Sequence, residues 1–194
     1  MDNSVTVERT SALAGVYKTG KFGALGLKSS VGVTLQDVHG LVLHQVAAWA
    51  DTAEEVGAGA AAAAGASVAP GPCKSESGES ASILRIEPLK WWLVGVQAPQ
   101  LESEKGATLD LSHSRTHIRI NGTESADFLN RFLPLDLREQ SFPVGSVASS
   151  VIHHVGITLW RSTEGYEMFI PRGFAVALWH GFVEVAEQFG LEVI

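Results

Sequence analysis

The chain has 194 residues, of which 45% are hydrophobic and only 18% are charged, and its formal net charge is −7. Globular domains usually carry about 25% charged residues, so this deficit indicates apolar surface that is buried in a subunit interface or in a large internal core. The acidic balance excludes a basic nucleic-acid-binding face, and the single cysteine, Cys73, excludes a disulfide framework and a thiolate metal cluster.

The start of the chain, residues 1–4, is acidic and polar, unlike the basic and then apolar start of a secretory signal. No apolar run approaches the roughly 20 residues that a membrane span requires. We therefore expect a cytoplasmic protein without membrane contact.

Residues 1–30 are rich in glycine and lack periodicity, but they include isolated apolar residues such as Leu13, Tyr17 and Phe22. A freely moving tail is normally poorer in such residues. We interpret the segment as an extended N-terminal arm that lies over another surface, with packing on its own domain as the alternative.

The glycines of the arm, Gly20, Gly23 and Gly26, superficially resemble a phosphate-binding loop. No Lys-Ser/Thr pair follows them, and no convincing strand or helix flanks them. No phosphate site is predicted here.

The next segment, 31–106, contains four predicted strands around one helix. The strands are recognised by alternating or continuous apolar residues and cover 33–38, 41–49, 83–86 and 91–96. The first two form either a hairpin or one bent strand. The helix is alanine-rich, covers 52–65, and begins with a capping-box pattern made by Thr52 and Glu55. A polar surface loop covers 67–82, and 97–106 is interpreted as a reduced helix.

The remaining segment, 107–194, follows the same plan. A long strand is predicted over 107–120, then a helix from the N-cap Thr123 to Leu133. Three strands follow over 145–170, with turns at 155–156 and 163–165. A closing helix over 173–189 is predicted to bury one stripe, formed by Phe174, Leu178, Phe182, Val185 and Phe189.

Both segments therefore have the order strand, helix, strand, strand, helix, with the last helix weak in the first segment. This order predicts an α+β fold of pseudo-duplicated split β-α-β halves, in which antiparallel sheets carry helices on one face. We expect one domain over 31–194, composed of two similar halves at about 31–106 and 107–194.

Asp110, Ser112 and His113 supply the residue types of a hydrolase triad, but they lie on a predicted continuous strand. Neighbouring residues on a strand point to opposite faces, and a nucleophilic serine needs a sharp exposed turn. We interpret these residues as structural and predict no catalytic residue.

Seven histidines occur in the chain, and two of them, His113 and His117, would share a strand face that His153 could approach across a sheet. A zinc site needs three or four ligands with supporting spacing, which the sequence lacks. No metal site is predicted.

Four tryptophans, Trp91, Trp92, Trp160 and Trp179, offer large flat apolar areas. Adjacent tryptophans on a strand cannot both face one core, so one of the first two is expected to point outward or into a partner, since tryptophan is enriched at interfaces. Core packing between sheet layers is the alternative.

Two arginines, Arg115 and Arg119, lie four apart on the long predicted strand and could hold Asp110 or Asp136. A structural ion pair is favoured over anion binding because nothing else marks a ligand site.

Several short motifs in a fixed order resemble the gamma subunit of heterotetrameric sarcosine oxidase. In the first half they are RTSAL at 9–13, GKFGA at 20–24, GVTL at 32–35, and Pro88 ahead of WWL at 91–93. In the second half they are DxSxxRxxxRxxG at 110–122, LPLDL at 133–137, FPxG at 142–145, PRxFA at 171–175, and LW at 178–179.

The resemblance implies the fold of the folate-binding aminomethyltransferase, the glycine-cleavage T-protein. It further implies a complex that oxidatively demethylates sarcosine to glycine, with formaldehyde or 5,10-methylenetetrahydrofolate and hydrogen peroxide as co-products. In such complexes FAD, FMN, NAD and zinc are held by the alpha, beta and delta subunits. This chain is then expected to be a non-catalytic structural subunit that binds no cofactor itself.

Two alternatives stay open at this point. The first is a subunit of a related N-methyl amino acid dehydrogenase, and the second is a stand-alone folate-binding protein of the aminomethyltransferase type. Nothing in this sequence discriminates among N-methyl amines, because the resemblance implies that the substrate binds to another subunit.

Overall fold

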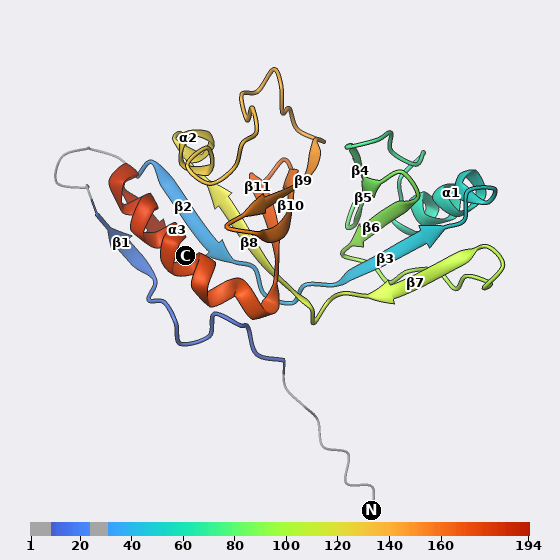
Figure 1. The fold of residues 1–194 in the computed structure, drawn as a ribbon, viewed down its shortest axis with the longest axis horizontal. Coiled ribbons are helices and arrows are strands. Elements are labelled where there is room, and N and C mark those ends of the chain that lie inside the picture. The colour runs from blue at the N-terminus through green and yellow to red at the C-terminus, as the bar shows by residue number, and fades with distance from the viewer. Residues whose placement is uncertain (1–8, 24–30) are drawn as a thin grey trace, which may run out of the picture.

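Two β-sheets connected by a pair of long strand ribbons form the framework of the protein (Figure 1). The computed structural model describes residues 9–23 and 31–194. The helices lie on the outer faces of the two sheets, so the expected α+β architecture is confirmed. None of the helices in these ranges has the length and apolar character that a membrane crossing requires.

The larger sheet has seven strands, and all of its strand pairs are antiparallel except β12 with β2. In spatial order its strands are β1 (Gly20–Phe22), β12 (Leu191–Val193), β2 (Val33–Asp37), β8 (Arg115–Asn121), β11 (Tyr166–Pro171), β10 (Val155–Arg161) and β9 (Val147–Ile152). Two helices pack on it: α2 (Ser125–Leu129) and α3 (Ala175–Ala186), the latter flanked by the single 3-10 turns η2 (Arg172–Phe174) and η3 (Glu187–Phe189).

The smaller sheet has five strands, which are antiparallel throughout. In spatial order they are β4 (Ser75–Ser77), β5 (Ser82–Glu87), β6 (Lys90–Val94), β3 (Leu43–Ala48) and β7 (Gly106–Asp110). Helix α1 (Ala53–Ala63) packs on its outer face. The short strands β1, β4 and β12 were not predicted, because three residues are too few to show an alternating pattern.

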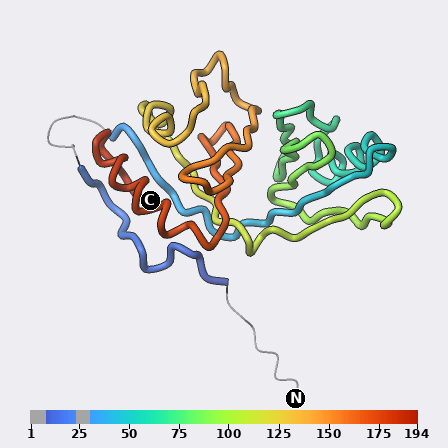
Figure 2. Tube along the Cα trace, viewed as in Figure 1, coloured from blue at the N-terminus to red at the C-terminus, as the bar shows by residue number. Residues whose placement is uncertain are grey.

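Two ribbons run from one sheet into the other side by side (Figure 2). Strand β2 pairs with β8 in the larger sheet, from Thr34 opposite Asn121 to Asp37 opposite Ile118. The same two segments continue as β3 and β7 in the smaller sheet. The two sheets therefore do not correspond to the segments 31–106 and 107–194. Strand β2 comes from the first segment but belongs to the larger sheet, and most of β7 comes from the second segment but belongs to the smaller sheet. The similarity of the two halves stays a prediction.

This exchange of strands corrects one expectation and decides between two alternatives. The strand predicted over 107–120 is two strands, broken at 111–114 by a turn in which the Ser114 amide donates to the Leu111 carbonyl. The segments 33–38 and 41–49 form the bent strand and not the hairpin, because β2 and β3 belong to different sheets.

The layers are helix, sheet, sheet and helix, with three hydrophobic clusters between them. This arrangement overturns the expectation that one of two adjacent tryptophans points outward. Trp91 faces α1 and Trp92 faces the larger sheet, and their exposures are only 2% and 3%. Strand β6 separates two cores, so both of its faces are apolar. Trp160 and Trp179 are buried as well.

The two predicted helix caps do not form capping bonds. Helix α1 forms where expected, but the Thr52 hydroxyl donates to the Lys105 carbonyl at 2.6 Å and makes no capping bond. Helix α2 has only five residues, and Thr123 lies outside it in a turn. The segment 97–106 contains turns and the start of β7 in place of a helix.

The closing helix is confirmed as α3 with its flanking 3-10 turns, although Phe174 is 53% exposed and lies outside the buried stripe. The turn predicted at 155–156 instead lies at His153 and His154, which form a two-residue hairpin loop between Ile152 and Val155.

The described part of the N-terminal arm packs on its own domain. Of the two alternatives for the arm, this is the second, and not an arm extended over another surface. Leu13 is fully buried in the core beneath the larger sheet, and the Tyr17 ring lies 4.9 Å from the Trp179 ring. Gly20 begins strand β1, which pairs with β12, and Gly23 follows that strand. Residues 1–8 and 24–30, including Gly26, lie outside the described ranges.

Candidate functional site at the junction of the two sheets

Ser112 is held in the turn between β7 and β8 by backbone contacts. Its hydroxyl accepts a hydrogen bond from the Leu43 amide at 3.0 Å and donates to the Leu43 carbonyl at 3.3 Å. Its own amide donates to Asp110 at 2.8 Å, and the Ser112 hydroxyl together with this amide lowers the pKa of that carboxyl. Ser112 is buried while His113 is exposed. The serine therefore ties β3 to the turn, a structural role for residue types that resemble a triad.

A buried charge network crosses strands β8 and β11 where they face the smaller sheet. Glu167, which is 1% exposed, receives hydrogen bonds from His117 at 2.6 Å, Arg119 at 2.8 Å and Ser162 at 2.8 Å. Burial raises the pKa of Glu167, but these partners together outweigh it and hold the pKa below its ordinary value. The His117 ring stacks on Phe169 at 4.6 Å. The network is satisfied within the chain, so it fixes the strands.

Beside this network lies a cleft between the two sheets, with a volume of about 520 Å³. Arg119 and Arg161 line it from the larger sheet, and Ser77 and Ser82 line it from the smaller one. The Arg161 guanidinium stacks over the Tyr166 ring at 4.2 Å. This cleft is lined by both sheets and mixes polar side chains with apolar ones such as Val94 and Trp160.

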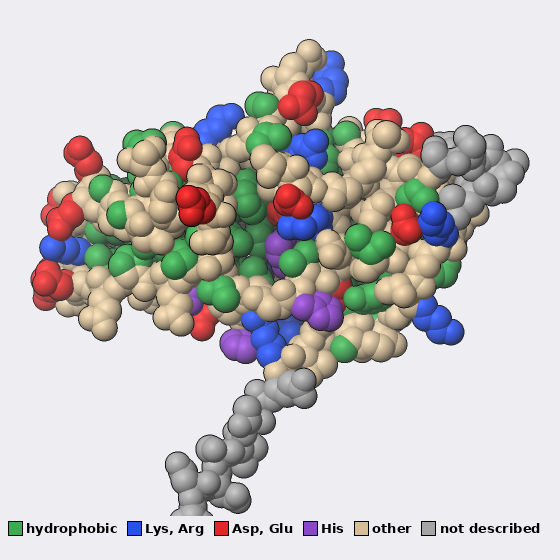
Figure 3. Space-filling model, turned by 180° about the vertical axis from the view of Figure 1, so that it is seen from behind, with side chains coloured by type: hydrophobic (Ala, Val, Ile, Leu, Met, Phe, Trp, Pro, Cys, Tyr) green, Lys and Arg blue, Asp and Glu red, His purple; other side chains and the backbone are tan. Residues whose placement is uncertain are grey.

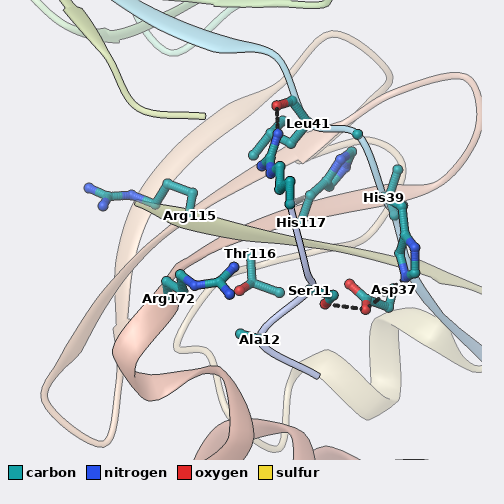
Figure 4. Close-up of a pocket in the computed structure, with 12 residues that line it drawn as sticks. Ser11, Ala12, Asp37, His39, Leu41, Arg115, Thr116, His117 and Arg172 are labelled. Atoms are coloured by element: carbon teal, nitrogen blue, oxygen red, sulfur yellow. Dashed lines mark hydrogen bonds and ion pairs between the residues drawn. The ribbon is translucent and has the colours of Figure 1, made fainter. Parts of the chain in front are cut away.

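A second, smaller cavity lies where the ribbons cross between the sheets, and we name it the junction cavity. Its volume is about 130 Å³, and its titratable lining residues are Arg9, Arg115, Arg172, Asp37, His39 and His117. In Figure 4, Arg172 points toward Thr116, while Ser11 meets Asp37 on the other side and Arg115 points away. Seen from behind in Figure 3, basic and histidine side chains gather beside the start of the described chain.

The junction cavity is the place where the N-terminal arm closes onto the ribbons. The Arg9 guanidinium donates to the carbonyl oxygens of Leu41 and Ser112, one from each ribbon. Arg172 donates to the Thr10 carbonyl at 2.7 Å. These bonds explain why an arm segment, a turn from each ribbon and η2 meet at one point.

The predicted ion pairs of Arg115 and Arg119 form differently from expectation. Arg119 pairs with Glu167 at 2.8 Å and approaches Glu164 at 3.5 Å. Asp136 pairs instead with Arg138. Arg115 lies over the Trp92 ring at 5.7 Å, and burial lowers the pKa of its guanidinium.

The histidines do not converge. His117 is buried beside Glu167, His113 lies in the turn between β7 and β8, and His153 belongs to the hairpin loop that follows β9. Across residues 9–23 and 31–194, no three His, Cys, Asp or Glu side chains are grouped to hold a metal ion.

Glu167, Arg172, Arg9, Asp37 and Thr116 are site residues that the sequence reasoning did not single out for chemistry. Glu167 carries a usable signal, because it is one charge inside the apolar run 166–171. Such a residue is buried only with partners. For Arg172 no local signal exists, since its neighbours in space come from the arm and β8.

Large apolar side chains also remain exposed, in keeping with the low charge content. Trp49 is 50% exposed and directly follows β3, and Leu109 is 54% exposed and lies in β7. The exposed tryptophan is thus one that the sequence reasoning did not select.

Comparisons with known proteins agree with the resemblance drawn from the sequence motifs. No family model matches the chain. It is 29% identical over 91 residues to the sarcosine oxidase subunit gamma of Arthrobacter sp., covering 47% of this chain and 45% of that protein. It is 26% identical over 95 residues to the protein of the same name from Corynebacterium sp. strain P-1, covering 48% and 47%. The chain spans about half the length of the curated relatives it matches.

The fold is shared with two solved structures. A chain of heterotetrameric sarcosine oxidase from Corynebacterium sp. U-96, in complex with pyrrole 2-carboxylate, matches with a TM-score of 0.75 at 21% identity. That match covers 93% of this chain and 96% of the other. The glycine cleavage system aminomethyltransferase T from Bartonella henselae matches with a TM-score of 0.56 at 15% identity, covering 84% and 48%. The expected aminomethyltransferase-like fold is confirmed.

Proposed function

We propose that this chain is a gamma-type structural subunit of a heterotetrameric sarcosine oxidase. The observation that carries the proposal is the fold match, which covers almost the whole of both chains. The curated relatives of the same name support it independently from sequence.

In this proposal the chain supplies structure and the chemistry belongs to its partners. The complex demethylates sarcosine to glycine, releasing hydrogen peroxide and either formaldehyde or 5,10-methylenetetrahydrofolate. FAD, FMN, NAD and zinc are held by alpha, beta and delta subunits. Ser112 and Glu167 form hydrogen bonds within the chain, which is consistent with a structural role. The exposed side chains of Trp49 and Leu109 suit a subunit interface.

The proposal is tested by purifying the tagged full-length chain from cells that also produce its natural partners. A particle that contains flavin-bearing chains and forms peroxide from sarcosine supports it. A stable monomer that associates with no flavoprotein contradicts it. Turnover of another N-methyl amino acid, with none of sarcosine, would identify the dehydrogenase alternative.

The stand-alone folate-binding alternative is less well supported, because the chain covers only 48% of the matched aminomethyltransferase. It has a separate test, which is titration of the isolated chain with tetrahydrofolate. Saturable binding would favour it over the structural role.

A further inference from the structure

The junction cavity concentrates cationic side chains that have no carboxylate partner. Arg9, Arg115 and Arg172 are three of the eight arginines of an acidic chain. Within the described ranges, none of the three lies within salt-bridge distance of an aspartate or glutamate. Among the described residues, the hydrogen bonds of Arg9 and Arg172 go to backbone carbonyls, so both keep their full positive charge available to a ligand.

A buried hydroxyl without a hydrogen-bond partner lines the same cavity. Thr116 is 5% exposed, and its Oγ1 makes no hydrogen bond with the part of the chain that the structure describes. Figure 4 shows the Arg172 guanidinium extending toward this threonine. Buried polar atoms are nearly always satisfied, so the orphaned hydroxyl indicates a group that it binds when the cavity is filled.

The opposite side of the cavity is anionic. The Asp37 side chain is only 2% exposed, and its Oδ2 atom accepts from the Ser11 hydroxyl at 2.5 Å and contacts His39 at 3.1 Å. Within the described ranges, its ion-pair partner is His39, and no lysine or arginine reaches it. The cavity thus offers a cationic end at Arg172 and Thr116 and an anionic end at Asp37.

The volume limits what can fit. At about 30 Å³ for each water-sized group, a cavity of about 130 Å³ holds roughly four such groups. From these observations we propose that the junction cavity binds a small zwitterionic α-amino acid of about the size of glycine. Arg172 and Thr116 bind its carboxylate, with Arg9 adding positive charge, and Asp37 binds its ammonium group.

The experiment is a calorimetric titration of the full-length chain with glycine, acetate and methylamine. Glycine is expected to bind saturably, and acetate and methylamine at least about tenfold more weakly, since each lacks one charged end. No saturable glycine binding, or acetate binding equal to glycine, overturns the proposal. The test is independent of the proposed function, because it needs neither partner subunits nor turnover.

Variants locate the site. Arg172→Gln is expected to weaken glycine binding at least about tenfold and Thr116→Val about threefold, with folding checked by circular dichroism. The matched control is Arg138→Gln, because Arg138 is an exposed arginine that contacts Asp136 elsewhere on the surface. Unchanged affinity in Arg172→Gln, or equal loss in the control, contradicts the assignment. Thr116→Val retains the shape of its side chain, so it tests the site even where the arginine variant fails to fold.

Discussion

His117 and Glu167 lie diagonally across the β8–β11 pair, with His117 Nε2 and Glu167 Oε2 2.6 Å apart and both side chains nearly inaccessible to solvent. Arg119, directly opposite Glu167, donates to the second carboxylate oxygen. One buried carboxylate therefore binds two residues of strand β8. Ser162, which directly follows strand β10, donates a hydrogen bond to the same carboxylate.

Replacing Glu167 with glutamine is expected to lower the free energy of unfolding by about 2–4 kcal/mol. The substitution leaves His117 and Arg119 buried or half-buried beside a neutral group. Urea denaturation measures the effect. Glu164→Gln is the matched control, because Glu164 is 66% exposed and lies 3.5 Å from the same arginine; its effect is expected within about 0.5 kcal/mol. Equal effects in the two variants would contradict the network as a source of stability.

The same carboxylate makes stability depend on pH. The pKa of Glu167 is below its ordinary value in the folded chain, while an unfolded glutamate has a pKa of about 4.3. Its contribution is therefore complete above about pH 5 and is lost as the pH falls through the folded pKa. We expect the free energy of unfolding of the native chain to fall more steeply below pH 5 than that of Glu167→Gln. Parallel pH profiles from denaturant titrations would show that other carboxyls dominate.

The sequence predicted the fold well where periodicity is long and local. The strands β5, β6, β10 and β11 and the closing helix α3 correspond to clear apolar patterns. It failed where a long-range partner decides the structure. One of Trp91 and Trp92 was expected in an interface, because a strand that borders one core buries only one of its faces. Strand β6 borders two cores, so both rings are buried.

The candidate site could be predicted less well than the fold. Arg115 was expected to hold an aspartate, but its environment is set by Trp92 from the other sheet. Arg9, Asp37 and Arg172 are far apart in the chain. They line one cavity because the N-terminal arm and η2 lie against the ribbons where these pass from one sheet to the other. Strand exchange between two sheets leaves no signature in local periodicity, so no spacing argument could bring these residues together.

The two glycines of α1 test how tightly this helix packs on the smaller sheet, because one faces open space and the other faces Trp91. A Cβ at Gly59 meets nothing within 4 Å, so Gly59→Ala is expected to stabilise the chain by about 0.5–1 kcal/mol through helix propensity. A Cβ at Gly57 would lie 3.1 Å from Cζ2 of the buried Trp91. We expect Gly57→Ala to be less stable than Gly59→Ala by at least about 1 kcal/mol. Thermal unfolding compares them, and equal melting temperatures would mean that Trp91 moves without cost.

The loop between β9 and β10 stores conformational strain that can be removed. His153 and His154 have φ angles of 46° and 72°, both in the left-handed region, as a two-residue hairpin loop requires. Both side chains are exposed, so substitution changes backbone preference more than packing.

We expect the double change His153→Asn and His154→Gly to raise the free energy of unfolding by about 1 kcal/mol, because Asn and Gly adopt these angles with less strain. His154→Val is the opposing control and should lower it by about 1 kcal/mol, since a β-branched residue resists a positive φ. Urea denaturation of the three proteins gives the order directly. A valine variant as stable as the glycine variant would show that the loop does not hold these angles in solution.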